Sequence, residues 1–219
     1  MESPAPATIC AVVKRRTQGC VTSRVGCSGY NGPMRNQPII HARRRIEGSN
    51  FLRAEQLDLE FSNGEKRTFE RLASFHSGAV MIVPMRDADT VLLVREYAAG
   101  MERYELGLCQ GKLDAGETPE EGANREMKEE IGFGARNITV LGAISTSPQY
   151  MTAMAHIVVA TDLYPERLEG DEPEPLEVVP FPMADLHELL AHPEVSGARS
   201  IAALFMAREF LAGRFMPDP

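Results

Sequence analysis

The sequence has no apolar run long enough to cross a bilayer and no excess of positive charge. Its longest apolar stretches, such as residues 79–84 and 91–94, are far shorter than the roughly 20 residues that a membrane-spanning helix needs. Lysine and arginine number 23 against 31 aspartates and glutamates, so the formal net charge is -8. An acidic chain is a poor match for a polyanion. We therefore expect neither a membrane nor a nucleic acid as the main partner.

Closely spaced cysteines are also lacking. Cys10, Cys20 and Cys27 lie near the N-terminus, and Cys109 stands apart from them. Zinc sites and redox motifs bring cysteines together at short, regular spacing. We interpret the four as free thiols in a reducing, cytoplasmic compartment, with a redox pair as the alternative.

The 219 residues suffice for one domain of ordinary size with an additional arm. Residues 1–33 show no hydrophobic periodicity and carry a single acidic residue, Glu2, against several basic ones. Such a composition is typical of a disordered tail or of a transit peptide. We expect residues 1–33 to be a disordered or wrongly assigned extension, with Met34 as the candidate start.

Hydrophobic periodicity predicts a β-hairpin followed by a mixed domain. Asn63-Gly64 lies between two alternating segments, 57–61 and 66–72, which is a strong hairpin signal. Further strands are expected at 78–84, 90–95, 138–144, 155–160 and 176–180, and helices at 119–131, 183–191 and 198–212. Strands mixed with few helices indicate an α/β (α+β) fold built in layers.

The helix expected at residues 119–131 has well-defined ends. Thr118 is placed as its N-cap, Pro119 as its first residue, and Glu121 completes a capping box. Gly132 is a natural residue for ending a helix. The sequence therefore predicts a helix of fixed register.

Three carboxylates share one face of this helix, because Glu126, Glu129 and Glu130 follow an i, i+3, i+4 spacing. Their repulsion costs about 0.2–0.5 kcal/mol per pair, and Arg125 offsets only part of it. A divalent cation would offset much more, and carboxylate oxygens suit Mg²⁺ or Mn²⁺. The alternative is a solvated acidic face. The opposite side of the helix is expected to face the core through Ala123, Met127 and Ile131.

Residues 111–133 match the Nudix box at each of its specified positions: Gly111, Glu117, Arg125-Glu126, apolar Met127, Glu129-Glu130, Gly132 and apolar Phe133. The chain resembles the Nudix hydrolases and, among them, the ADP compounds hydrolase (NudE) type. The similarity spans roughly residues 34–213 and includes segments 59–64, 79–84, 95–97, 104–107, 162–166 and 168–175.

This resemblance implies a Nudix fold, in which a mixed β-sheet lies between helices. Residues 34–75 would form an N-terminal antiparallel β arm that contributes to a homodimer, and residues 76–219 the Nudix domain with its box at 111–133. Glu126 and Glu130 would be metal ligands, and Glu129 a ligand or a residue that positions the attacking water. The main-chain carbonyl of Gln110 would add a ligand. Mainly structural roles would fall to Gly111, Glu117, Arg125 and Gly132.

Related ADP-ribose-cleaving enzymes use a further glutamate from a loop ahead of a late strand. Glu174 fits that place best as the general base and Glu172 comes next, while Glu129 is a second candidate base. The alternative is a merely solvated, proline-rich acidic loop. Pro148 and Tyr150 occupy positions that mark ADP-ribose and dinucleoside polyphosphate hydrolases respectively, although each could simply shape or pack its loop.

The expected activity is metal-dependent hydrolysis of ADP-linked compounds (ADP-ribose, diadenosine di- or triphosphate, NADH) with release of AMP. Arg95 and Glu105 are candidate substrate-binding residues, although Arg95 could equally form a structural ion pair. Two alternatives remain: a nucleotide-pool sanitiser that releases pyrophosphate from oxidised nucleoside triphosphates, and a non-catalytic ADP-ribose sensor. The complete set of box glutamates argues against the sensor, and the hairpin arm argues against the sanitiser.

Overall fold

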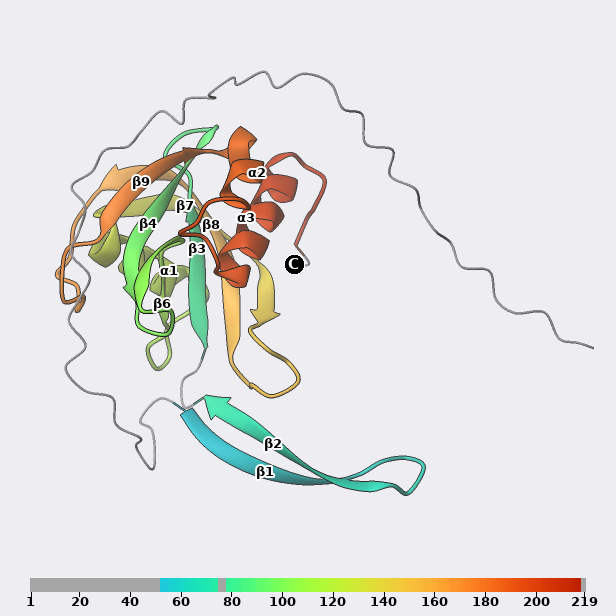
Figure 1. The fold of residues 1–219 in the computed structure, drawn as a ribbon. Helices are drawn as coiled ribbons and strands as arrows, with labels where there is room; N and C mark the ends of the chain where they lie inside the picture. The colour runs from blue at the N-terminus through green and yellow to red at the C-terminus, as the bar shows by residue number, and fades with distance from the viewer. Residues whose placement is uncertain (1–51, 75–77, 218–219) are drawn as a thin grey trace, which may run out of the picture. The chain divides into compact units, whose positions relative to one another are not determined.

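The computed structural model describes residues 52–74 and 78–217 of the chain (Figure 1). The expectations for residues 1–33, and for the arm before residue 52, fall outside these ranges. No helix in the described ranges has both the length and the apolar character needed to cross a membrane. The elements are β1 (Leu52–Glu60), β2 (Lys66–Ser74), β3 (Ala79–Pro84), β4 (Thr90–Ala98), β5 (Arg103–Gly107), β6 (Gln110–Lys112), α1 (Pro119–Glu130), β7 (Phe133–Ser145), β8 (Met154–Pro165), β9 (Glu177–Pro182), a 3₁₀ turn (Met183–Asp185), α2 (Leu186–Leu189) and α3 (Ala198–Leu211).

Strands β1 and β2 form the hairpin expected from the sequence. They pair antiparallel from Leu52↔Ser74 to Glu60↔Lys66. In the connecting turn Gly64 has φ +83°, a conformation that glycine adopts without strain. The side chain of Asn63 accepts a hydrogen bond from the Glu65 amide at 3.1 Å. The Asn-Gly pair therefore shapes this turn as predicted.

After the hairpin, seven strands of the described residues form two further sheets. One sheet has the order β6-β3-β8-β7 and the other the order β5-β4-β9. Within them β3 and β8 run parallel, whereas the remaining pairs are antiparallel. The expected mixed sheet is confirmed.

Strand β3 is buried on both faces, as its uninterrupted apolar run indicates. Val80 and Ile82 belong to a core cluster that includes Ala123 and Met127 of α1. The alternate residues of β3 belong to a second cluster with residues of α2 and α3, including Met81, Val83, Leu186, Ala203 and Leu204. The strands thus lie between α1 on one side and α2 with α3 on the other (Figure 1).

The structure corrects three expectations about elements. Strands β5 and β6 are absent from the sequence-based assignment. The single helix expected at Met183–Ala191 is wrong, because a 3₁₀ turn is followed by the short helix α2. Neither piece has a side-chain N-cap, and the buried residues Met183, Leu186 and Leu189 recur every third position. That spacing fits a 3₁₀ turn as well as an α-helix.

Candidate active site

Helix α1 is fixed at both ends, and this sets the direction of its side chains. The Thr118 hydroxyl accepts a hydrogen bond from the Glu121 amide at 3.2 Å, and the Glu121 carboxylate accepts one from the Thr118 amide at 2.9 Å. This is the predicted capping box. Beyond the last turn Gly132 has φ +75°, as expected of a residue that ends a helix.

The apolar side of α1 packs fully against the sheets. Ala123, Met127 and Ile131 are buried, as predicted from their spacing. This packing carries two neighbouring carboxylates partly inside the protein, since Glu126 is 9% exposed and Glu130 is 6% exposed. Burial raises the pKa of Glu126 to about 7 and that of Glu130 to about 8. The helix therefore holds two desolvated carboxyl groups one turn apart.

Arg125 ties the polar side of the helix to the loop that precedes it. Its guanidinium forms ion pairs with Glu117 at 2.9 Å, Glu126 at 2.8 Å and Glu129 at 3.0 Å. It also donates a hydrogen bond to the Lys112 carbonyl at 2.9 Å. These contacts lower the pKa of Glu117 and hold the Glu126 and Glu129 carboxylates beside the guanidinium. The structural role expected of Arg125 and Glu117 stays a prediction, which these contacts support.

Gly111 lies directly beneath the carboxylate of Glu126. A β-carbon at this position would collide with the Glu126 carboxylate. Gly111 belongs to β6, which pairs with β3 and so is held by the central sheet. The glycine therefore allows the helix to bring Glu126 against the backbone next to Gln110.

Two groups beside the box were not identified from the sequence. The fully buried thiol of Cys109 hydrogen-bonds to Glu130, and burial raises the pKa of that thiol well above its usual value. Burial also raises the pKa of Glu96, on β4, whose charge acts on Glu130. Cys109 directly precedes Gln110, yet its contact with Glu130 depends on how β6 packs against α1. Residue spacing therefore carries no signal for it.

The loop between β8 and β9 brings a further carboxylate to the box. Glu172 contributes to the electrostatic environment of Glu126, Glu130 and Glu96. Its side chain lies over Gly170, where a β-carbon would collide with it. That same β-carbon would lie 3.6 Å from Cβ of Glu129, so this part of the loop adjoins α1.

Glu174, the first candidate for the general base, is held differently. Its carboxylate accepts a hydrogen bond of 2.6 Å from the Tyr104 hydroxyl on β5. Glu172, by comparison, contributes to the electrostatic environment of both Glu126 and Glu130. The two loop glutamates therefore have different surroundings.

Arg95 and Glu105 join the sheet to the segment before α3. Arg95 forms ion pairs with Glu177 at 2.7 Å and Glu194 at 2.9 Å. Glu105 accepts hydrogen bonds from the amide and the hydroxyl of Ser196 at 2.9 and 2.8 Å. The ion pairs of Arg95 are those expected of the structural alternative. A substrate-binding role of Arg95 and Glu105 stays a prediction.

Pro148 and Tyr150 lie in the loop between β7 and β8. The Tyr150 carbonyl accepts a hydrogen bond from the Leu72 amide at 2.7 Å, and Thr152 donates to the Leu72 carbonyl at 3.0 Å. The loop therefore contacts the end of β2. The Tyr150 side chain is exposed, and within the described residues its hydroxyl is hydrogen-bonded to Ser147. The substrate-binding role of Pro148 and Tyr150 stays a prediction.

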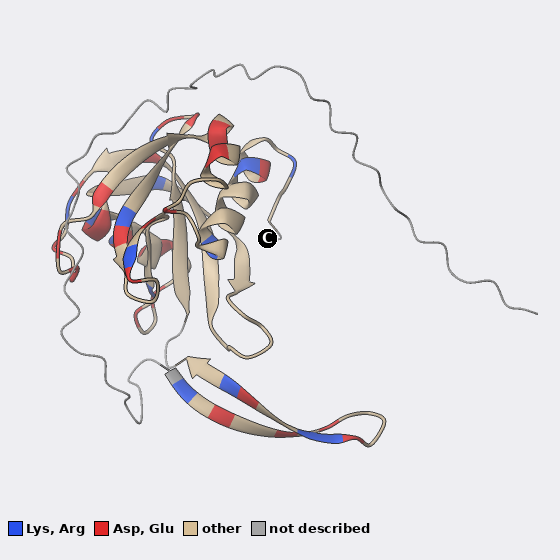
Figure 2. Ribbon diagram, in the orientation of Figure 1, with Lys and Arg blue, Asp and Glu red and all other residues tan. Residues whose placement is uncertain are grey.

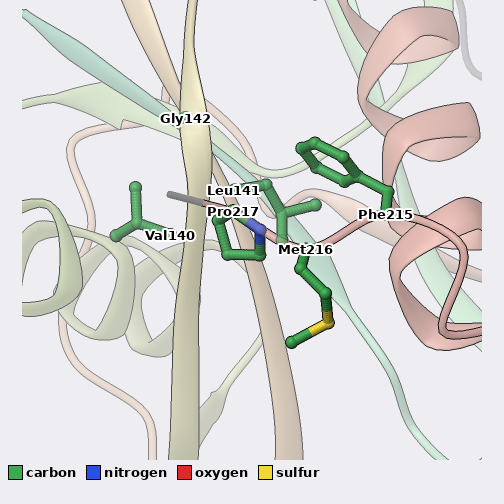
Figure 3. Close-up of a pocket in the computed structure, with 6 residues that line it drawn as sticks. All are labelled: Val140, Leu141, Gly142, Phe215, Met216 and Pro217. Carbon is green, nitrogen blue, oxygen red and sulfur yellow. The ribbon is translucent and has the colours of Figure 1, made fainter. Parts of the chain in front are cut away.

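A pocket of about 370 Å³ lies elsewhere, between the bulge of β7 and the C-terminal segment. Figure 3 shows its walls, formed by Val140, Leu141, Gly142, Phe215, Met216 and Pro217. None of these side chains is ionisable, and none belongs to the box. By contrast, acidic residues recur along α1 and along the loop between β8 and β9 (Figure 2). The candidate site is therefore rich in carboxylates, whereas the lining of this pocket has no charged side chain.

The oxygen donors around α1 suit a divalent cation in kind. Glu126 and Glu130 are desolvated carboxylates whose mutual repulsion a cation would relieve. In the described part of the chain, no three His, Cys, Asp or Glu side chains already converge on one point. Instead the Glu126 and Glu129 carboxylates pair with Arg125. The chemistry of the donor set thus fits a hard cation, with carboxylates that would turn towards it.

Comparison with known proteins agrees with this arrangement. Residues 75–205 match the model of the NUDIX domain, and residues 38–71 match that of the NudE-type Nudix hydrolase N-terminal domain. The chain is 49% identical to the ADP compounds hydrolase NudE of Escherichia coli over 178 residues, which cover 81% of this chain and 95% of that protein. It is 32% identical to an ADP-ribose pyrophosphatase of Bacillus subtilis, over 67% of this chain and 80% of that protein.

A solved structure described as the crystal structure of ADP compounds hydrolase superposes with a TM-score of 0.70 at 48% identity. The match covers 82% of this chain and 96% of that chain. Nudix hydrolases generally depend on a divalent metal, in keeping with the donor set around α1. The sequence match, the shared fold and the box carboxylates agree: this chain belongs to the Nudix hydrolase family and is an enzyme of the pyrophosphatase kind.

Proposed function

We propose that this enzyme hydrolyses the diphosphate bond of ADP-linked compounds and releases AMP. ADP-ribose, diadenosine di- or triphosphate and NADH are the substrates we assign to it. One observation carries the proposal: Glu126 and Glu130 lie partly buried on one face of α1, with Arg125 and Glu129 beside them. The relatives that act on ADP compounds and on ADP-ribose support the choice of substrate.

Mg²⁺, with Mn²⁺ as the alternative, is the metal that we propose for the site. Glu126 and Glu130 would hold it, with Glu129 and the main-chain carbonyl of Gln110 as further donors. A bound divalent cation neutralises phosphate charge, lowers the pKa of a bound water and aligns the attack. Oxygen donors are common to sites for both metals.

Glu172 replaces Glu174 in our proposal as the residue that accepts the proton of the attacking water. It lies in the loop that adjoins Glu129, and its charge acts on both buried box carboxylates. A base must reach the water that the box positions. The surroundings of Glu172 meet this requirement better than those of Glu174, which is hydrogen-bonded to Tyr104.

The products follow from hydrolysis of one phosphate–phosphate bond by water. ADP-ribose would give AMP and ribose 5-phosphate, and diadenosine triphosphate would give AMP and ADP. NADH would give AMP and reduced nicotinamide mononucleotide. The chain's own contribution is to orient the reacting groups and to take up a proton, which is how enzymes commonly accelerate transfer at phosphorus.

A homodimer is the assembly that we propose. On the hairpin, Leu59, Phe61 and Phe69 are each more than 40% exposed. The two phenylalanine rings lie 6.2 Å apart and form a small apolar surface, of the kind that a second subunit covers. A cytoplasmic location stays our proposal from the cysteine pattern, and the buried free thiol of Cys109 is compatible with a reducing compartment.

Product analysis tests the activity directly. The enzyme is incubated with and without Mg²⁺ with ADP-ribose, diadenosine triphosphate, NADH and an oxidised dGTP. We expect AMP from the three ADP-linked compounds, and only when metal is present. Pyrophosphate from the oxidised dGTP alone would identify a nucleotide-pool sanitiser instead. Tight binding of ADP-ribose without turnover of any compound would identify a sensor.

A further inference from the structure

The loop from Glu166 to Leu176 is attached at its first residues to the C-terminal end of α1. The amide of Glu166 donates to the Gly132 carbonyl and the amide of Leu168 to the Lys128 carbonyl, both at 3.1 Å. Arg167 donates to the Glu129 carbonyl at 3.3 Å. The carbonyls of Lys128 and Glu129 belong to the last turn of α1, where carbonyls lack an intrahelical donor, and Gly132 lies just beyond that turn. The box helix thus holds the beginning of the loop.

A different element holds the end of the loop. The Tyr104 hydroxyl donates a hydrogen bond of 2.6 Å to the Glu174 carboxylate, a charge-assisted bond of the stronger class. Tyr104 is itself held in the β4–β5 pair opposite Tyr97, and the two rings meet edge to face with centroids 5.6 Å apart. Its side chain is buried. Glu174 is therefore held by a rigid part of the sheet.

Glu172 lies between these two attachments, two residues before Glu174. The loop adjoins α1 at Gly170, and Glu172 acts on Glu126 and Glu130 from there. Two residues of chain allow little freedom once Glu174 is held. Any release of Glu174 would consequently let Glu172 move away from the box.

We propose that Tyr104, acting through Glu174, is a positioning residue that keeps Glu172 over the carboxylates of the Nudix box. This inference rests on the proposed function of the site. It assigns Tyr104 and Glu174 a role that requires a hydrogen bond but no transfer of a proton to Glu174. A glutamine at position 174 would still accept the tyrosine hydroxyl through its amide oxygen.

Four variants test the proposal: Tyr104→Phe, Glu174→Ala, Glu174→Gln and the double variant Tyr104→Phe/Glu174→Ala. We expect Tyr104→Phe and Glu174→Ala each to lower kcat for ADP-ribose by about 10- to 100-fold, since small displacements of a reacting group have effects of this size. KM should change little. Glu174→Gln should stay near the wild-type rate, and the double variant should be no slower than the slower single variant.

The matched control is Tyr97→Phe, which removes the hydroxyl from the neighbouring ring of the same aromatic pair and should leave kcat unchanged. Affinity for Mn²⁺, measured without substrate by electron paramagnetic resonance, should be the same in every variant. Hydrogen exchange of residues 168–176 should rise in Tyr104→Phe and Glu174→Ala but not in Glu174→Gln. This last measurement needs no turnover.

Four results would overturn the inference, and a fifth would reject the proposed function on which it rests. Glu174→Gln as slow as Glu174→Ala would make the Glu174 carboxylate itself the base. A wild-type kcat in Tyr104→Phe, or additive losses in the double variant, would separate Tyr104 from the action of Glu174. A wild-type enzyme that releases no AMP would reject the proposed function instead. In that case unchanged hydrogen exchange in Tyr104→Phe would still reject the attachment of the loop.

Discussion

Glu126 and Glu130 are carboxyl groups held where water is scarce, and their raised pKa values are a direct consequence. Their positions follow from helical spacing, which is why the sequence alone identified them. The contacts that surround them do not follow in this way. Tyr104 and Glu174 are 70 residues apart, and Cys109 meets Glu130 across two packed elements. Such pairs become visible only when the chain is folded.

Neutralising the box carboxylates should abolish most of the activity. We expect Glu129→Gln and Glu130→Gln each to lower kcat by about 100-fold or more, because each removes a group that binds the metal or orients the water. The measurement is AMP release from ADP-ribose in saturating Mg²⁺. Glu120→Gln, an exposed glutamate in the first turn of the same helix, is the control that should stay active. Near-normal rates in both box variants would refute the metal assignment.

The stability of the metal-free enzyme should fall as the pH rises. Burial raises the pKa of Glu130 from its ordinary value of 4.5 to about 8 in the folded chain. Between these values the folded protein retains a proton that the unfolded chain has released, so the free energy of unfolding decreases with pH. Below pH 4.5 Glu130 is protonated in both the folded and the unfolded state, so its ionisation no longer lowers the free energy of unfolding.

Glu130→Gln should therefore be more stable than wild type at pH 8 without metal, by about 1–3 kcal/mol. The two proteins should converge near pH 4. Urea denaturation in the presence of a chelator at both pH values measures this difference. Equal midpoints at pH 8 would mean that Glu130 is not held in a desolvated environment.

Among the elements, the box helix was predicted closely and the short strands were missed. Its capping box and terminal glycine are local signals, so the limits of α1 agree with expectation. Strand β6 has three residues, one of them Gly111, and carries no periodicity to detect. Residues 183–191 satisfied a helical pattern but form a 3₁₀ turn and the short α2. Local pattern predicts long elements well, and tertiary packing decides the short ones.

The contact between β6 and α1 makes Gly111 intolerant of a side chain. Gly111→Ala would drive a methyl group into the Glu126 carboxylate, so we expect loss of most activity and of Mn²⁺ affinity. Gly100→Ala is the matched control, because a β-carbon there meets nothing within 4 Å. Activity assays and thermal melting of both variants test this. Full activity in Gly111→Ala would show that Glu126 does not need its present position.

For the whole molecule, the layered Nudix domain and the hairpin were both predicted from sequence, whereas the assembly depends on surfaces that a single chain leaves exposed. Phe61 and Phe69 are 46% and 45% exposed on the hairpin. Apolar side chains of this size are rarely left together on a surface without a partner. Their arrangement supports the proposed dimer.

Polar substitution of these rings should weaken association. We expect wild type to elute as a dimer in size-exclusion chromatography with light scattering, and Phe61→Ser/Phe69→Ser to shift towards the monomer. Met216→Ser, which alters the most exposed of the large apolar side chains found away from the hairpin, serves as the control and should remain dimeric. A monomeric wild type would contradict the proposal.

The parallel pairing of β3 with β8 also dictates an order of events during synthesis on the ribosome. The hairpin β1–β2 and the pair β4–β5 join neighbouring segments and can close soon after they emerge. Strand β3 cannot pair with β8 until Ala155, the partner of Ala79, has been synthesised. One edge of the apolar strand β3 therefore stays unpaired while the box helix is already being made. Contacts between residues so far apart in the sequence form slowly, and the partly folded intermediates expose apolar surface that promotes aggregation. Nascent chains that stall before β8 should therefore keep this apolar edge unpaired and be prone to aggregation.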